Sequence, residues 1–189
     1  MTSLCLPKIT KDFPDFNYNE MKARANNLLT SYLLAIEEKN ITLLQEGTSE
    51  LKNKVSNYIL LLNNRNATEH FRDISLHRTE LSGYRKDKGR CIITFQTSLE
   101  YYHYLTDQGN QVIEGEKDFK YQTRFDVDLI YIQDRSLVEQ ELDHALGINC
   151  PNCGAPLTSL GAKVCIYCDT PVIELNIHAW SFSDVRETN

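Results

Sequence analysis

Two pairs of cysteines, each with two residues between its members, constrain this chain more than any other feature. The pairs are Cys150 with Cys153 and Cys165 with Cys168. Each C-x-x-C knuckle can supply two thiolates to one ion, so two knuckles at this distance provide the four sulfur ligands of a tetrahedral Zn²⁺. A redox dithiol needs one such pair and not two. We therefore predict one structural zinc ion on Cys150, Cys153, Cys165 and Cys168, with a redox dithiol or disulfides as the alternative.

The residues around the knuckles fit this prediction. Gly154 follows the first knuckle, where the backbone must turn, and Pro151 stiffens the turn. Asp169 holds the equivalent place in the second knuckle and tolerates left-handed backbone less well. Four cysteines complete the coordination sphere and leave no position for a water, so the metal is expected to hold a fold and not to catalyse. Thiols kept for zinc also imply a reducing compartment, which predicts a cytoplasmic protein.

The length of the chain sets its division into domains. A chain of 189 residues with 41% hydrophobic residues can bury one sizeable core and leave a small appendage that needs a metal in place of a core. We predict an extended arm over residues 1–16, an α+β domain over 17–135, a helical linker over 136–147, and a zinc ribbon with a tail over 148–189.

The charge distribution argues against nucleic-acid binding. The net charge is −6, and the predicted ribbon offers just Lys163 and Arg186, whereas a ribbon that binds phosphates needs a basic face. The one dense basic run, residues 85–90, is expected to be a solvated hairpin tip, with contact to an anionic lipid or an acidic partner as the alternative. No stretch of eighteen apolar residues and no secretory signal is present, so we expect a soluble chain.

The first third of the chain has helical periodicity. Pro7 and Pro14 predict an extended start, and Asp15 or Asn17 is expected to cap a long amphipathic helix that ends near Asn40. A short helix should follow over 42–46, and a third should begin at Thr48 or Ser49. Its apolar stripe is Leu51, Val55, Tyr58, Ile59 and Leu62.

After residue 66 the pattern alternates, as in strands. Four strands are predicted over 71–84 (with a bulge before Leu81), 91–105, 111–116 and 119–132. Helices followed by an antiparallel meander predict an α+β fold in which a curved sheet packs over the helices.

These residues resemble a known family. The segments concerned are Lys11–Phe16, Tyr101–Tyr102, Gly109 with Val112–Gly115, and Ile132–Arg135. They look like the Tim-44-like domain, which is named from a subunit of the mitochondrial inner-membrane translocase. The resemblance implies a cystatin-like cone of the nuclear-transport-factor type and a partner-binding or membrane-associated scaffold. The order of domain and ribbon is similar to bacterial members of that family, many of which carry a membrane segment that this sequence lacks.

Cone folds also host enzymes that use an inward acid or base in an apolar cavity. Asp126 and Asp128 share the polar face of their strand, so they are not expected to form an interior dyad. Among the residues that could act as a base, His103 alone lies on the apolar, inward face of its predicted strand, and Asp107 is near it in sequence. We therefore predict a non-enzymatic interaction scaffold, with a small-molecule-binding or catalytic cone as the alternative.

Three further predictions concern contacts. Trp180 is expected to dock the ribbon onto itself or onto the cone. Cys91 should be a buried thiol, and Cys5 should lie in a mobile tail. The partners we expect are an unidentified protein, a second copy of the chain, and peripheral contact with a membrane. The second copy would pair around a two-fold axis through the polar face of the last predicted strand, where an arginine and an aspartate can pair with their symmetry mates; that face is Gln122, Arg124, Asp126 and Asp128.

Overall fold

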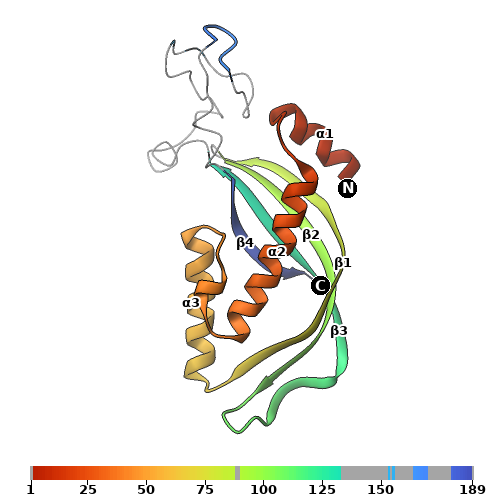
Figure 1. Cartoon of the computed structure of the whole chain (residues 1–189), viewed down its shortest axis with the longest axis vertical. Helices are drawn as coiled ribbons and strands as arrows, with labels where there is room; N and C mark the ends of the chain where they lie inside the picture. The colour runs from red at the N-terminus through yellow and green to blue at the C-terminus, as the bar shows by residue number, and fades with distance from the viewer. Residues whose placement is uncertain are drawn as a thin grey trace.

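The computed structural model describes residues 2–87, 90–132, 153, 155, 164–169 and 180–188. Within these ranges, three α-helices pack on a four-stranded antiparallel sheet of order β1-β2-β3-β4. Figure 1 shows the long strands curving around α2, with α1 and α3 on either side of it. This arrangement confirms the predicted α+β fold with N-terminal helices on a curved sheet.

The helices begin where the capping residues predict. Helix α2 covers Tyr18–Glu37, and the side chain of Asn17 accepts a hydrogen bond from the backbone N–H of Glu20. A 3₁₀ turn, η1, covers Ile41–Leu43 in place of the predicted helix over 42–46. Helix α3 covers Ser49–Asn64, with Thr48 as its N-cap. Each cap satisfies a backbone donor that the first turn of a helix leaves without a partner.

The predicted extended arm is wrong, because Thr2–Asp12 forms helix α1 with Pro7 inside it. Proline removes one helical hydrogen bond, which is why the sequence argued against a helix here. Burial outweighs that loss: Ile9 is fully buried, Phe13 nearly so, and Cys5 packs partly against the same core. Cys5 is therefore not in a mobile tail.

The strands are longer and fewer in the middle of the chain than predicted. Strand β1 covers Thr68–Asp87, β2 covers Arg90–Thr106, and β3 covers Val112–Ile132. The segments 111–116 and 119–132 were predicted as two strands, but β3 runs through both and absorbs the break as a shift in its pairing with β2. The predicted bulge in β1 is present, since the register shifts between Leu76 and Arg78.

The fourth strand comes from the end of the chain and corrects the predicted domain plan. Trp180–Thr188 was placed in the tail of the ribbon, yet it forms β4 and pairs with β3, with Val185 opposite Val127. The ring of Trp180 lies 4.9 Å from Phe13 and 5.1 Å from Tyr131 between centroids, so it docks onto the cone. Aromatic burial on the sheet is the reason this segment joins it. In chain order, the cysteine segment is therefore an insertion between β3 and β4, and the predicted linker 136–147 lies outside the described residues.

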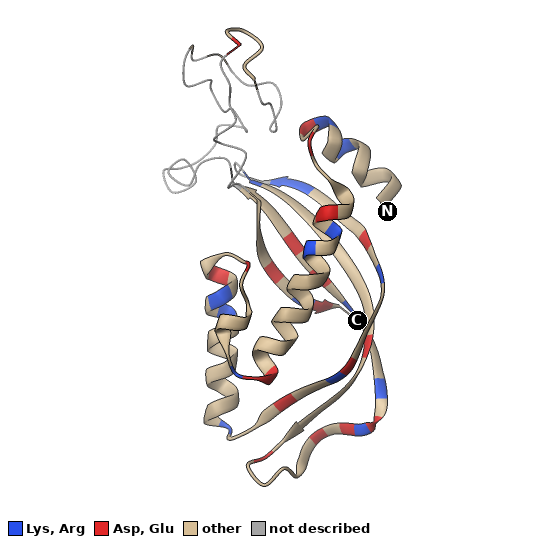
Figure 2. Cartoon of the chain, viewed as in Figure 1, with Lys and Arg blue, Asp and Glu red and all other residues tan. Residues whose placement is uncertain are grey.

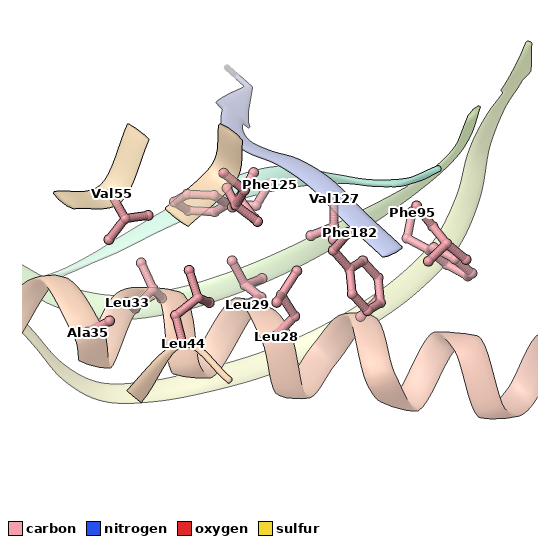
Figure 3. Close-up of a cluster of buried hydrophobic side chains, with 14 of the residues drawn as sticks. Leu28, Leu29, Leu33, Ala35, Leu44, Val55, Phe95, Phe125, Val127 and Phe182 are labelled. Carbon is pink, nitrogen blue, oxygen red and sulfur yellow. The ribbon is translucent and has the colours of Figure 1, made fainter. Parts of the chain in front are cut away.

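The space between the helices and the sheet is filled with apolar side chains. Figure 3 shows leucines of α2 meeting aromatic and branched residues from α3, β2, β3 and β4. Those labelled include Leu28, Leu29, Leu33, Val55, Phe95, Phe125, Val127 and Phe182.

No helix within the described ranges is both long and apolar enough to cross a membrane.

Residues at the starts of the helices and along α3 make hydrogen bonds to both edge strands of the sheet. On the β4 side, the backbone N–H of Thr48 donates to the carbonyl of Phe182 at 2.8 Å, and Lys54 Nζ donates to the carbonyl of Val185 at 3.0 Å. On the β1 side, the backbone N–H of Leu81 donates to the hydroxyl of Thr2.

Candidate functional site

Three of the four predicted zinc ligands lie together. The sulfur atoms of Cys153, Cys165 and Cys168 are all within 4.8 Å of one another, and Sγ of Cys153 is 3.7 Å from Sγ of Cys165. Thiolates at about 2.3 Å from a tetrahedral zinc are about 3.8 Å apart, whereas sulfurs in a disulfide are about 2.05 Å apart. The spacing of Cys153 and Cys165 therefore fits shared metal ligands. Cys150 lies outside the described residues.

The second knuckle has the backbone geometry that its sequence suggested. Asp169 adopts the left-handed conformation, with φ of 54°, and its N–H donates to the carbonyl of Cys165 at 2.9 Å. This hydrogen bond closes the turn that carries Cys165 and Cys168. Cys165 is fully buried and Cys153 is exposed, so the cluster has one protected and one accessible side.

His103 points into the cone, but its carboxylate partner is Glu69 and not Asp107. The distance from Nε2 of His103 to Oε1 of Glu69 is 2.7 Å. Asp107 instead accepts hydrogen bonds from the backbone N–H groups of Gly109 and Gln111 in its own turn. Glu69 was not predicted as a partner because the first strand was predicted to begin at residue 71. The sequence did contain a signal for Glu69, because it is two residues before Phe71 and side chains two residues apart lie on the same face of a strand.

Tyr58 completes a chain of three polar groups in the cone. Its hydroxyl donates to Oε2 of Glu69 at 2.7 Å, so both oxygens of this buried carboxylate have partners. Burial, followed by the hydrogen bond to Glu69, raises the pKa of Tyr58 and keeps the phenol protonated. The order is thus Tyr58, Glu69, His103.

An open hollow of about 650 Å³ lies beside this chain of polar groups. Its lining comes from α2 and α3: Tyr32, Glu50, Asn53, Lys54, Asn57, Tyr58 and Leu61. Burial, followed by the negative charges of Glu69, Asp184 and Glu187, raises the pKa of Tyr32 to about 12. The neighbourhood of Tyr32 is therefore negatively charged.

Asp126 and Asp128 lie on the sheet face opposite the buried Phe125 and Val127, in agreement with their predicted parity. Both are bound by Arg186 of β4, whose Nη1 is 2.6 Å from Asp128 and whose Nη2 is 3.3 Å from Asp126. The hydroxyl of Thr94 also donates to Asp128 at 2.6 Å. These acids therefore tie β3 to β4.

That network bears on the predicted homodimer. The expected two-fold contact relied on Arg124 pairing with an aspartate of the same face in a second copy, yet both Asp126 and Asp128 already have Arg186 of their own chain as a partner. Arg186 was missed as a partner because its segment was assigned to the ribbon. The homodimer stays a prediction, without the ion pair that supported it.

The basic run over residues 85–90 is partly neutralised within the chain. Nζ of Lys86 is 2.6 Å from Asp12, and Nη2 of Arg85 is 3.5 Å from Asp128. Figure 2 shows basic residues at the end of the sheet next to α1, the helix in which Asp12 is the last residue. Lys88 and Gly89 lie outside the described residues.

Cys91 is a buried structural thiol, as predicted. It is fully buried in β2, and burial is the main influence that raises the pKa of its thiol. A protonated, inaccessible thiol is a poor nucleophile.

Comparison with protein-family models and with curated proteins gives no match. Among solved structures, the chain is similar to the crystal structure of the intermembrane space region of chloroplast protein ARC6. The TM-score is 0.48 at 7% sequence identity, over 92% of this chain and 98% of that one. Values this low say nothing about what the chain binds or does, so the sites stand on their own geometry.

Proposed function

We propose that this chain is a non-enzymatic protein-interaction scaffold whose cysteine segment holds one structural zinc ion. The observation that carries the interaction role is a group of exposed apolar side chains on β3. This distal sheet surface consists of Phe119 and Tyr121, which alternate onto one face of the strand. The exposed Val112 and Ile113 begin the same strand, and one of the two shares that face while the other lies on the opposite one. Figure 1 shows the strands extending beyond the end of α3 here, so none of the described helices covers this part of the sheet. Grouped exposed apolar residues are typical of sites that bind another protein.

The surroundings of the distal sheet surface support a protein as the occupant. Lys120 binds Asp73 at 2.8 Å and Glu100 at 3.2 Å, and Lys117 lies over the ring of Tyr104. Apolar and aromatic residues inside a rim of mixed charges are typical of protein interfaces. The resemblance to the Tim-44-like domain, which implies a partner-binding scaffold, points in the same direction.

Four thiolates from two knuckles would hold a zinc ion by Cys150, Cys153, Cys165 and Cys168, and the described sulfurs have a spacing that suits this. The ion would supply the folding energy that so short a segment lacks. Because zinc thiolates persist in reducing conditions, we place the protein in the cytoplasm, with peripheral membrane contact as a further proposal.

Site-specific photo-crosslinking tests the interaction role. A photoreactive residue at position 119 in the native host should capture a protein, and one at Leu4, an exposed apolar residue of α1, should not. The captured protein is then purified and its affinity measured by calorimetry. Phe119→Ser should weaken binding at least tenfold, as the loss of an aromatic anchor does, and Leu4→Ser should change it less than twofold. Equal capture at both positions, or unchanged affinity of Phe119→Ser, would contradict the proposal.

A second candidate function is a catalytic cone, and the Glu69–His103 pair favours it. A carboxylate 2.7 Å from one imidazole nitrogen orients the ring and leaves the other nitrogen to accept a proton. Such a base could remove a proton next to a carbonyl group. Deuterium exchange into a panel of small ketones would show it: exchange that His103→Gln abolishes supports the candidate, and exchange equal in both proteins excludes it.

A further inference from the structure

The hollow between α2 and α3 is lined mainly by tyrosine, asparagine and leucine side chains. Tyr32 belongs to α2, and Asn57, Tyr58 and Leu61 follow one another along one side of α3. Its volume of about 650 Å³ is within the range of pockets that take small molecules. The aromatic rings and Leu61 provide apolar contact, and the asparagines provide polar contact.

Towards a ligand in this hollow, the hydroxyl of Tyr58 can act as a hydrogen-bond acceptor and not as a donor. Its proton is donated to Oε2 of Glu69 at 2.7 Å. What the oxygen can offer a ligand is therefore its lone pairs, and these are the complement of an N–H donor. Donating this hydrogen bond to the carboxyl group also increases the electron density on the phenol oxygen.

The charges around the hollow favour a cation. Besides being buried, Tyr32 feels the negative charges of three nearby carboxylates, those of Glu69, Asp184 and Glu187, which raise the pKa of its hydroxyl. Lys54 is the cationic residue of the lining, and its Nζ is already 2.6 Å from Asp184 and 3.0 Å from the carbonyl of Val185. The positive charge of Arg65 by itself would lower the pKa of Tyr58, but this charge already has a partner, since Nη2 of Arg65 is 3.8 Å from Oε2 of Glu114.

We infer that this hollow binds a small organic cation, an ammonium group carried on an apolar body. The ammonium group donates to the Tyr58 hydroxyl and to the asparagine side chains, and the apolar body lies against Tyr32 and Leu61. Tyrosine faces attract cations as well as apolar groups, so the two parts of the ligand use the same walls. This binding site is separate from the distal sheet surface and does not depend on the zinc ion.

Three probes of similar shape and different charge test the inference on the whole chain. They are phenethylamine, neutral 2-phenylethanol and anionic 3-phenylpropionate, each titrated at neutral pH while amide resonances are followed by NMR. Phenethylamine should shift the resonances around Tyr32 and Tyr58 and bind at least tenfold more tightly than the other two. Its affinity should fall as sodium chloride is raised, because part of the attraction is electrostatic.

Matched variants assign the effect to the hollow. Glu187→Gln removes one nearby exposed charge and should weaken phenethylamine two- to threefold, and Tyr58→Phe should weaken it about fivefold. Glu116→Gln, which removes another exposed charge on β3, is the control and should leave the affinity unchanged. If 2-phenylethanol or 3-phenylpropionate binds as tightly as the amine, or if no probe shifts these resonances, the inference is wrong. An equal effect of Glu187→Gln and Glu116→Gln would overturn it as well.

Discussion

Gly115 shows how one residue lets β3 stay a single strand. Its φ is 78°, in the region that favours glycine, and a Cβ added there would lie 2.4 Å from the carbonyl oxygen of His103. It sits where the pairing of β3 with β2 shifts, opposite Tyr104. A side chain would need both a strained backbone and a displaced neighbour.

Gly115→Ala should therefore destabilise the fold by about 2 kcal/mol or more, from backbone strain and the clash with β2 together. Gly83→Ala is the matched control in the same sheet. Gly83 has an ordinary backbone conformation, and an added Cβ would meet the nearest atoms of Thr94 at 3.4 Å, which is normal contact. Urea denaturation of both variants measures the difference. Equal stability of the two would show that the Gly115 geometry is not needed.

At the residue scale, the sequence predicted which face of a strand a side chain lies on better than it predicted the hydrogen-bond and ion-pair partners of that side chain. Alternation placed His103 inside and Asp126 outside, because a strand fixes the side of each residue. It did not identify Glu69 or Arg186 as their partners. Partners depend on which strands are neighbours and in what register, and these follow from packing of the whole chain and not from local pattern.

At the element scale, α1 is held on the sheet by a polar contact as well as by its apolar face. Asp12 accepts a hydrogen bond from Tyr84 and forms an ion pair with Lys86 at 2.6 Å. Burial by itself would raise the pKa of Asp12, but the hydrogen bonds from Lys86 and Tyr84 and the charge of Lys86 outweigh it and lower the pKa below the usual 3.8. A carboxyl group whose pKa is lowered on folding adds stability above pH 3.8, and that stability is lost as the pH falls through the lower, folded value.

Asp12→Asn should accordingly destabilise the protein at pH 7 by about 1 kcal/mol, a figure that allows for solvent screening of a surface pair. The difference from the wild type should shrink as the pH falls below 3.8, since protonation removes the same charge. Chemical denaturation at pH 7 and pH 3 gives both values. A difference that is independent of pH would mean that Asp12 does not act through its charge.

The elements themselves divide into those with local signals and those without. Helices α2 and α3 have caps and apolar stripes, so Asn17 and Thr48 located their starts. Helix α1 contains Pro7, and its formation depends on burying Ile9 against the sheet, which local propensity does not include. Strand β4 lies far along the chain from the rest of its sheet, so its short alternation around Phe182 gave no indication of which element it pairs with.

At the scale of the whole molecule, the cysteine segment leaves the sheet after Ile132 and returns at Trp180. This topology links zinc binding to the fold through loop closure. A metal that joins Cys150 to Cys168 shortens the loop between β3 and β4, and the entropy of closing a loop depends weakly on its length.

Loss of the zinc ion should thus lower the free energy of unfolding of the cone by just about 0.5 kcal/mol. Trp180, the single tryptophan, packs on Phe13 and reports on β4 by its fluorescence. Denaturation of Cys165→Ser, followed at Trp180, measures the effect. As a control, Phe182→Ala removes a fully buried side chain and should cost about 3–5 kcal/mol. A loss of similar size in Cys165→Ser would show that the metal supports the sheet directly.

The central claim is a structural zinc ion on four cysteines, and the metal content of the purified protein tests it most directly. Protein prepared without chelators and under reducing conditions should contain about one zinc per chain by mass spectrometry of the element. Cys153→Ser and Cys165→Ser should lose it, and Cys5→Ser, which changes a thiol in α1, should keep it. Wild-type protein without zinc, with Cys153 and Cys165 joined to other cysteines in disulfides, would contradict the account.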